Sequence, residues 1–279
     1  MGDASVDPDD FDAFEAAGWE EKADAYERLF GDIASRVVEP LLNAAAVAAG
    51  TRVLDVATGP GWVAARAAER GASVVGIDVA EAMITRARSA HPDLDFRRAD
   101  AHDLPFADAS FDAVVSNFAI MHFSRPERAM AEFARVLRPG GRLALTAWAA
   151  PSEHRLVGVF LDALAEAHAV PPADLPRGPD FFRFSDDETL AAALRQQDLA
   201  SSAGTAIAFV HRFGSPDELW DGMLAATVRM SALITLQPGD VRRRIRAAFD
   251  RLAAGYRRGD VLELPVAVKL ATARKPDPR

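Results

Sequence analysis

Short β-branched runs alternate with helix-like runs between residues 52 and 149. The strand-like runs are RVLDVAT, SVVGIDV, LDFRRAD, FDAVVSNFA and RLALTAW, and the helix-like runs are GWVAARAAERG, AEAMITRARSA and PERAMAEFARVL. Repetition of strand and helix is typical of a parallel sheet that is covered by helices. This stretch therefore predicts an α/β fold.

Residues 11–49 have the apolar period of a helix. Their large apolar side chains recur at mostly helical intervals, at Phe14, Trp19, Tyr26, Leu29, Phe30, Ile33 and Val37. Pro40 is expected to interrupt the helix, because proline lacks the backbone N–H that a helix interior uses. Residues 1–50 are therefore predicted to form an N-terminal helical arm.

The pattern changes after Trp148. A helix over 155–168 is followed by the proline-rich loop VPPADLPRGP and by a helix that begins near Ser185. Two strand-like runs, 205–213 and 264–273, bracket helical runs over 216–235 and 239–257. We expect these runs to be the last two strands of the same sheet, with the helices inserted as a cap.

Three segments of a single domain are therefore predicted. They are the helical arm of residues 1–50, a core of residues 51–150, and the remaining strands with the inserted helical cap, residues 151–279.

Composition narrows the class of function. The chain has 279 residues, is 49% hydrophobic and 26% charged, and has no apolar run that could span a membrane. Its start, MGDASVDPDDFDAF, lacks the features of a signal peptide, so a cytoplasmic location is expected. The absence of cysteine excludes thiolate catalysis, Cys-ligated zinc and iron–sulfur clusters. A net charge of −9 argues against nucleic-acid binding and favours small-molecule chemistry.

The segment VLDVATGPGW leads from a strand through a glycine turn into a helix. Gly59 and Gly61 let the backbone turn tightly and approach a ligand, although the G-x-G-x-x-A pattern also occurs in dinucleotide-binding proteins. Nineteen residues after Gly59, Asp78 ends the next strand, where a carboxylate can accept both hydroxyls of a ribose. The alternative is that Asp78 caps the following helix. Asp100 follows the third strand, at the edge where ligands of such sheets bind.

Four ordered motifs carry a resemblance to a known family. Residues 53–61, Asp78, the stretch ADAHDLPFADASFDAVVSNFAIMHF and the run RVLRPGGRLALTAW resemble the motifs of class I S-adenosylmethionine-dependent methyltransferases. The resemblance is to the group similar to the ubiquinone/menaquinone C-methyltransferases, and it covers about residues 50–150. It implies a Rossmann-like, mostly parallel sheet of seven strands with a reversed last strand. An NAD-dependent reductase is the alternative, but it leaves Asp55 and Asp100 unexplained.

The resemblance also implies which residues hold the cofactor, S-adenosyl-L-methionine. The residues expected around its methionine part are Asp55, Gly59 and Gly61, and Asp78 is expected to bind the ribose. The residues expected beside the adenine are Val79, Met83, Asp100 and Ala101. Asn117 and Phe118 are expected near the sulfonium. Tyr26 is the candidate to close over the cofactor, and the alternative is that it is an ordinary aromatic residue of an amphipathic helix.

Methyl transfer is an in-line displacement in which a general base is optional. His122, five residues after Asn117, is the predicted catalytic base, because an imidazole suits proton removal from a phenol, an enol or an activated carbon. The alternative is that His122 positions the substrate or is structural. His154 is the next candidate, whereas His102 and His91 are expected to be structural.

The acceptor pocket is expected to be apolar. Its predicted aromatic and methionine residues are Trp19, Phe118, Met121, Trp148, Phe181, Phe182, Trp220, Met223 and Met230, and the alternative is that these residues form the core of the cap. A hydrophobic small molecule of secondary metabolism or quinone-like chemistry is therefore the predicted acceptor. No metal is expected, and activity should survive EDTA.

Two further questions stay open in the sequence. A cofactor-binding cyclase or lyase of the same fold would carry similar motifs without transferring a methyl group. The sequence also leaves the acceptor atom and the oligomeric state undecided, with a homodimer among the options.

Overall fold

A single mixed sheet forms the centre of the protein in the computed structural model, which describes residues 7–201 and 204–278. Among these residues the sheet has nine strands in the order β3-β2-β1-β4-β5-β9-β6, with β7 and β8 also paired to β9. The strands are β1 (Arg52–Val56), β2 (Ser73–Asp78), β3 (Asp95–Arg98), β4 (Phe111–Ser116), β5 (Leu137–Trp148), β6 (Ala200–Ser201), β7 (Thr205–Phe213), β8 (Arg257–Arg258) and β9 (Val261–Arg274).

Strands β1 to β5 are parallel, as the strand–helix repetition predicts. The strand β9 runs antiparallel to both β5 and β7, which confirms the reversed last strand. The predicted number of seven strands is wrong, because the two-residue strands β6 and β8 also pair with β9. Such short pieces carry too few residues to show a period in the sequence.

The N-terminal arm is one helix, α1 (Pro8–Ala44), of 37 residues. The expectation that Pro40 interrupts it is wrong, because the helix continues through the proline. The next two residues, Leu41 and Leu42, are fully buried. Their packing compensates for the lost hydrogen bond, as tertiary contacts commonly override local helix propensity.

Successive residues of the strands face two different hydrophobic clusters. Val53 of β1 packs with Leu42 of α1 and Val63 of α2 (Trp62–Glu69). Its neighbour Leu54 belongs to the second cluster, with Met130 of α4 (Pro126–Val136). The alternation follows from the two-residue period of a strand, so helices cover both faces of the sheet.

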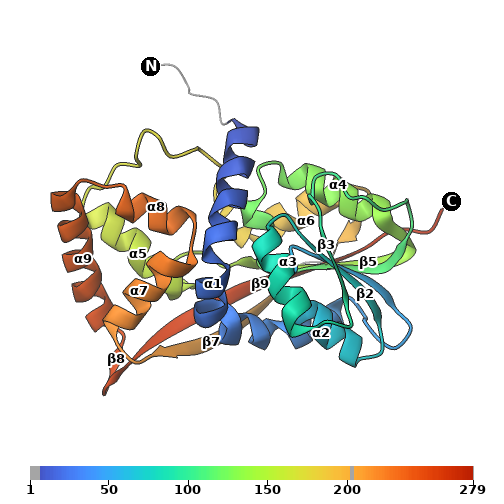
Figure 1. Cartoon of the computed structure of the whole chain (residues 1–279), viewed down its shortest axis with the longest axis horizontal. Coiled ribbons are helices and arrows are strands. Elements are labelled where there is room, and N and C mark those ends of the chain that lie inside the picture. Colours follow the sequence, from blue (N-terminus) through green and yellow to red (C-terminus); the bar gives the residue numbers. More distant parts are fainter. Residues whose placement is uncertain (1–6, 202–203, 279) are drawn as a thin grey trace.

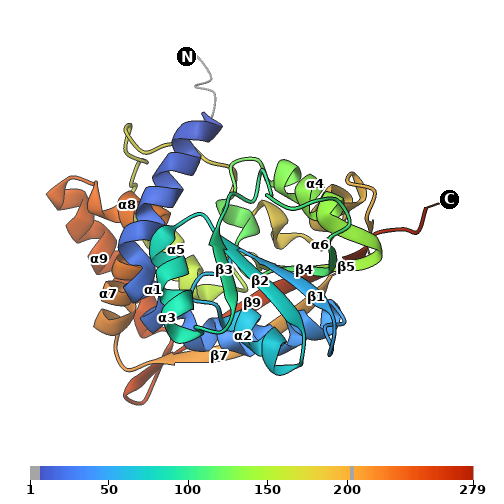
Figure 2. The same cartoon turned by 45° about the vertical axis from the view of Figure 1, so that its right-hand side comes forward.

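The remaining helices lie mostly after β5. They are α5 (Arg155–Glu166), α6 (Asp187–Arg195), α7 (Pro216–Ala226), α8 (Arg229–Thr235) and α9 (Gly239–Ala254), with short 3₁₀ turns η1 (Ile120–His122) and η2 (Arg183–Ser185). The predicted cap helices form α7, α8 and α9, between β7 and β8. In Figures 1 and 2 they gather with α5 to one side of the sheet, and α1 runs between this group and the parallel strands. No described helix is long and apolar enough to cross a membrane.

Polar contacts fasten α1 to the core and to the cap. The Glu20 carboxylate accepts hydrogen bonds from the backbone N–H groups of Glu81 and Ala82, at 2.6 and 2.8 Å. These residues begin α3 (Glu81–Ala90), whose N-cap residue Ala80 makes no side-chain cap. On the cap side, Lys22 Nζ donates to the carbonyl of Leu224 in α7 at 3.1 Å. The arm therefore satisfies terminal backbone groups of helices on both sides.

The capping contact of Glu20 predicts a measurable loss of stability. Glu20→Ala leaves two N–H groups of α3 without their partner and should lower the free energy of unfolding by about 1 kcal/mol, as for other lost caps. Urea denaturation measures this change, and Glu21→Ala, at the adjacent exposed position, is the control. Equal stability of the two variants would show that Glu20 does not hold α1 to α3.

Candidate active site

One cavity of about 540 Å³ is lined by residues of α1 and by residues at or just after the carboxyl ends of the parallel strands β1 to β5. This volume is within the range of about 300 to 1,000 Å³ that is usual for small-molecule sites. The predicted site residues that line it are Tyr26, Gly59, Asp78, Val79, Met83, Asp100, Ala101, Asn117, Phe118 and His122. Asp55 and Gly61 do not line it.

Asp55 and Gly61 shape the glycine loop from behind the cavity wall. The Asp55 carboxylate accepts hydrogen bonds from the Thr58 hydroxyl at 2.5 Å and from the Ala64 N–H at 3.1 Å. Burial raises the pKa of Asp55 to about 7. Gly61 has a φ of +89°, and a Cβ there would lie 2.8 Å from the Phe96 ring. Only glycine meets both constraints at this position.

Asp78 joins the end of β2 to the glycine loop. One carboxylate oxygen accepts the Gly59 N–H at 2.9 Å and the other accepts the Ala80 N–H at 3.0 Å. Because the first N–H groups of α3 bond to Glu20, Asp78 is not the cap of that helix. Each oxygen keeps a lone pair for a ligand. Burial raises the pKa of Asp78 to about 6.

Asp100 and His102 hold each other in the loop after β3. The same Asp100 oxygen accepts the His102 backbone N–H at 2.8 Å and lies 2.9 Å from His102 Nδ1. This contact lowers the pKa of Asp100 below its usual value. His102 lines the cavity, and its Nε2 atom is buried without a hydrogen-bond partner among the described residues.

The end of β4 is fixed by a hydroxyl of β5. The Thr146 hydroxyl donates to Asn117 Oδ1 at 2.7 Å and accepts the Phe118 N–H at 2.8 Å. Phe118 has a φ of +57°, which is uncommon for a bulky residue. Its ring stacks on Trp148 with centroids 3.9 Å apart. The strained backbone therefore places this ring on the cavity wall.

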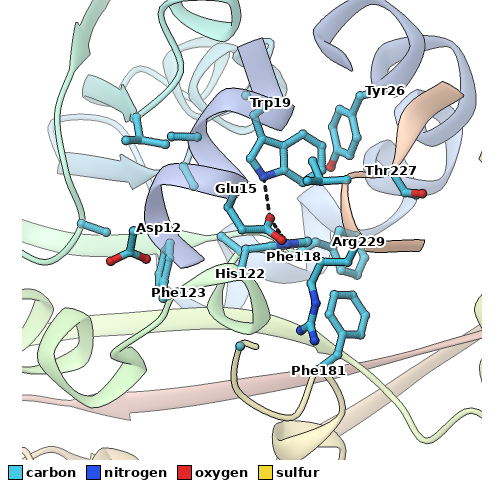
Figure 3. Close-up of a pocket in the computed structure, with 18 of the residues that line it drawn as sticks. Asp12, Glu15, Trp19, Tyr26, Phe118, His122, Phe123, Phe181, Thr227 and Arg229 are labelled. Carbon is cyan, nitrogen blue, oxygen red and sulfur yellow. Dashed lines mark hydrogen bonds and ion pairs between the residues drawn. The ribbon is translucent and has the colours of Figure 1, made fainter. Parts of the chain in front are cut away.

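His122 contacts a buried carboxylate of α1. Its Nδ1 lies 2.9 Å from Glu15 Oε2, and the Trp19 indole N–H donates to the same oxygen at 3.1 Å (Figure 3). Glu15 is 3% exposed, and its other oxygen has no partner among the described residues. A carboxylate on Nδ1 favours the tautomer in which that nitrogen carries the proton, which leaves Nε2 free to accept another one.

Tyr26 packs among the aromatic residues of α1 beside the cavity. Its ring lies 5.1 Å from Phe30 and 5.3 Å from Trp19, and it stacks on Trp62 at 6.0 Å. Burial raises the pKa of the Tyr26 hydroxyl, so this group stays neutral. Trp62 packs on α1 and does not line the cavity.

His154 lies outside the cavity. It is fully buried and stacks on Trp148 with centroids 4.1 Å apart. Burial and the neighbouring Arg155 lower the pKa of His154 to about 3, so its ring is neutral. The geometry therefore does not support His154 as an alternative base. His91 also stays outside and packs near the ring of Phe96.

The acceptor side of the cavity is mostly aromatic and aliphatic. Of the residues proposed for it, those that line the cavity are Trp19, Phe118, Trp148, Phe181, Phe182, Met223 and Met230. Met121 and Trp220 are instead part of the core, where Trp220 packs on Phe160 and Phe249.

Four charged residues of the wall were not predicted, namely Asp12, Glu15, Asp180 and Arg229. Glu15 stands in the apolar stripe of α1, four residues from both Phe11 and Trp19, and a carboxylate at such a position is a readable signal. Arg229, at the start of α8, carries no comparable pattern. The side chains of Glu15 and Arg229 lie beside His122 in Figure 3.

The wall suits the parts of S-adenosylmethionine. Asp78 offers two carboxylate oxygens to a diol, and the free oxygen of Asp100 can accept an amino group. Val79 and Met83 add apolar side chains to the same cavity wall. Unpaired buried atoms of Glu15 and His102 also line this wall, as expected where a ligand completes the site.

Comparisons with known proteins agree with these features. Residues 54–145 match a family model described as a methyltransferase domain. The demethylmenaquinone methyltransferase of Paenarthrobacter aurescens is 30% identical over 241 residues, which cover 76% of this chain and 95% of the relative. That of Beutenbergia cavernae is 33% identical over 193 residues, which cover 66% and 79% of the two chains.

Solved structures show the same fold. The YcgJ protein of Bacillus subtilis superposes with a TM-score of 0.59 at 22% identity, over 87% of this chain and 99% of that one. The cyclase SpnF superposes with a TM-score of 0.51 at 22% identity, over 88% and 82%. With the sequence relatives, these likenesses show that the chain belongs to the class I S-adenosylmethionine-dependent methyltransferases, in the group of the menaquinone C-methyltransferases, and that its cofactor is S-adenosylmethionine.

Proposed function

We propose that the protein methylates a carbon or an oxygen of an apolar, ring-containing small molecule related to quinols. The observation that carries this proposal is the Glu15–His122 pair, which stands among the aromatic residues of the cavity wall. The relatives named demethylmenaquinone methyltransferases favour quinone-like chemistry over an unspecified secondary metabolism.

The cofactor roles follow the chemistry of the wall. We assign the ribose hydroxyls to Asp78, the adenine to Val79, Met83, Asp100 and Ala101, and the sulfonium region to Asn117 and Phe118. Gly59 lets the backbone approach the methionine part, whereas Asp55 and Gly61 act through the shape of the loop. Tyr26 closes the cavity from α1.

His122 acts as the general base in this proposal. When bound, S-adenosylmethionine supplies a methyl group whose bond pair stays on sulfur while a pair from the acceptor forms the new bond. His122 Nε2 takes the acceptor's proton, and Glu15 stabilises the imidazolium that results. The aromatic wall excludes water and holds the acceptor in line.

Two alternatives have different products. A cyclase or lyase would convert its substrate without forming S-adenosylhomocysteine, and the likeness to SpnF concerns the fold alone. The matching family model and the relatives named above are methyltransferases, which favours methyl transfer over an NAD-dependent reductase.

Methyl transfer itself is tested with methyl-labelled S-adenosylmethionine and a panel of prenylated and unprenylated naphthoquinols. We expect label in the organic product and an equal amount of S-adenosylhomocysteine. Conversion of a substrate without S-adenosylhomocysteine would favour the cyclase or lyase. Transfer only to small hydrophilic amines would reject the apolar acceptor.

The affinity for S-adenosylmethionine should depend on the ionisation of Asp78. The ionised carboxylate accepts the ribose hydroxyls, so affinity should fall as the pH drops through about 6, the pKa of Asp78. At pH 5 we expect binding about tenfold weaker than at pH 7.5. Asp78→Asn should weaken binding at pH 7.5 by about 1 to 3 kcal/mol and remove this dependence. Calorimetric titration measures both effects.

Two variants serve as controls for this titration. Asp55→Asn removes a nearby carboxyl whose pKa is about 7, so it shows how much of the pH dependence of binding comes from Asp55 and not from Asp78. Asp103→Asn alters an exposed carboxylate outside the cavity and should behave like the wild type. An unchanged pH dependence in Asp78→Asn would contradict the assignment of Asp78.

Removal of the base should lower turnover without loss of the cofactor. His122→Ala should reduce kcat by about 10²- to 10⁴-fold, the usual contribution of general-base catalysis. Glu15→Gln keeps the size of the side chain but removes its charge, and it should reduce kcat less. Single-turnover assays with labelled cofactor measure the chemical step.

The control for His122 is His168→Asn, at an exposed position outside the cavity. S-adenosylhomocysteine should bind all these variants with similar affinity, which shows that they are folded. If His122→Ala turns over the true acceptor within a few-fold of the wild type, His122 is a positioning or structural residue.

A further inference from the structure

Arg229 is the one arginine or lysine among the described residues that line the cavity. Its Nη1 donates to the carbonyl of Pro179 at 3.1 Å, and its guanidinium lies 5.3 Å from the centre of the Phe11 ring. Within the described part of the chain, no carboxylate comes within salt-bridge distance of it. Arg229 is thus a half-buried cation that uses few of its five N–H donors.

Such an arrangement is costly in a protein without a ligand. A buried cation loses its hydration, and a carbonyl and an aromatic face replace only part of it. Burial accordingly lowers the pKa of Arg229 from its usual value, while the charges of Glu15 and Asp180 act in the opposite direction. An anionic oxygen in the cavity would supply the missing partner.

The neighbours of Arg229 place such an anionic oxygen next to His122, the proposed base. Glu15, whose charge acts on Arg229, is the residue that holds His122. The His122 ring packs on Phe181 with centroids 5.4 Å apart. Figure 3 shows the Arg229 side chain running beside His122 toward Phe181. A molecule that fills this part of the cavity therefore meets a base, a cation and apolar rings together.

We propose that Arg229 binds the oxyanion of the acceptor, so that the acceptors are phenols, enols or hydroxyquinones that react as anions. This inference rests on the proposed methyl transfer to an apolar ring. The acceptor's proton goes to His122 Nε2, and its negative charge is held by the guanidinium until the new bond to methyl forms. A charge-assisted hydrogen bond to arginine is stronger than one between neutral groups. The same contact selects against ring compounds that have no acidic hydroxyl.

Binding of two matched probes tests this role without turnover. The enzyme is saturated with S-adenosylhomocysteine and titrated at pH 7.5 with 2-hydroxy-1,4-naphthoquinone, an anion, or with neutral 2-methoxy-1,4-naphthoquinone. Quenching of tryptophan fluorescence reports binding, since Trp19 and Trp148 line the cavity. We expect the wild type to bind the anion at least tenfold more tightly than the neutral probe.

Variants of Arg229 assign the preference to its charge. Arg229→Met keeps a long apolar side chain and should bind both probes alike, whereas Arg229→Lys should keep part of the preference. Arg242→Met, at an exposed position of α9, is the control and should match the wild type. Unchanged affinity for S-adenosylhomocysteine shows that each variant is folded.

Other outcomes overturn the proposal. A wild type without a preference for the anion, or an Arg229→Met variant that retains it, excludes oxyanion binding by Arg229. If Arg229→Met bound both probes more weakly and by the same factor, Arg229 would only pack against the cavity wall or neutralise the charge of Glu15. Failure of the proposed function would give a different result. The naphthoquinol panel would then not be methylated, but the wild type would still prefer the anion and Arg229→Met would still lack this preference.

Discussion

The buried carboxylate of Glu15 connects the N-terminal helix α1 to His122, the proposed base. A carboxylate in an apolar stripe is costly to bury unless donors reach it, and the Trp19 indole and the His122 imidazole supply them. The second donor belongs to η1, so Glu15 Oε2 gains it only where α1 lies across the cavity. In this position α1 lines the cavity with Tyr26 and also contacts the His122 imidazole through Glu15.

The parallel core and its cofactor side could be predicted from the sequence because their signals are local. A strand of β-branched residues, a glycine turn and a helix follow one another without interruption between residues 53 and 69. Asp78 and Asp100 follow the next two strands, and the carboxyl ends of parallel strands meet at one edge of a sheet. Sequence position alone thus brought these carboxylates together.

The acceptor side could not be predicted to the same extent because it is built from distant segments. Glu15 and His122 are 107 residues apart, and Arg229 comes from the inserted cap. His154 was a candidate base because sequence shows its chemistry but not its complete burial against Trp148. Pro40 also stays within α1 because tertiary packing, and not local propensity, determines where that helix ends.

The distribution of charged residues around the cavity bears on the proposed methyl transfer. In the proposed assignment, Asp78 and Asp100 face the cationic cofactor, and Arg229, with Glu15 and Asp180 near it, faces the acceptor anion. Asp78 is buried and Arg229 is partly buried, so their charges are screened less than that of the exposed Asp100. Methyl transfer turns a sulfonium and an oxyanion or carbanion into two neutral products. Under the proposed assignment, the charged wall would hold these neutral products less strongly than the charged reactants, which would favour their release.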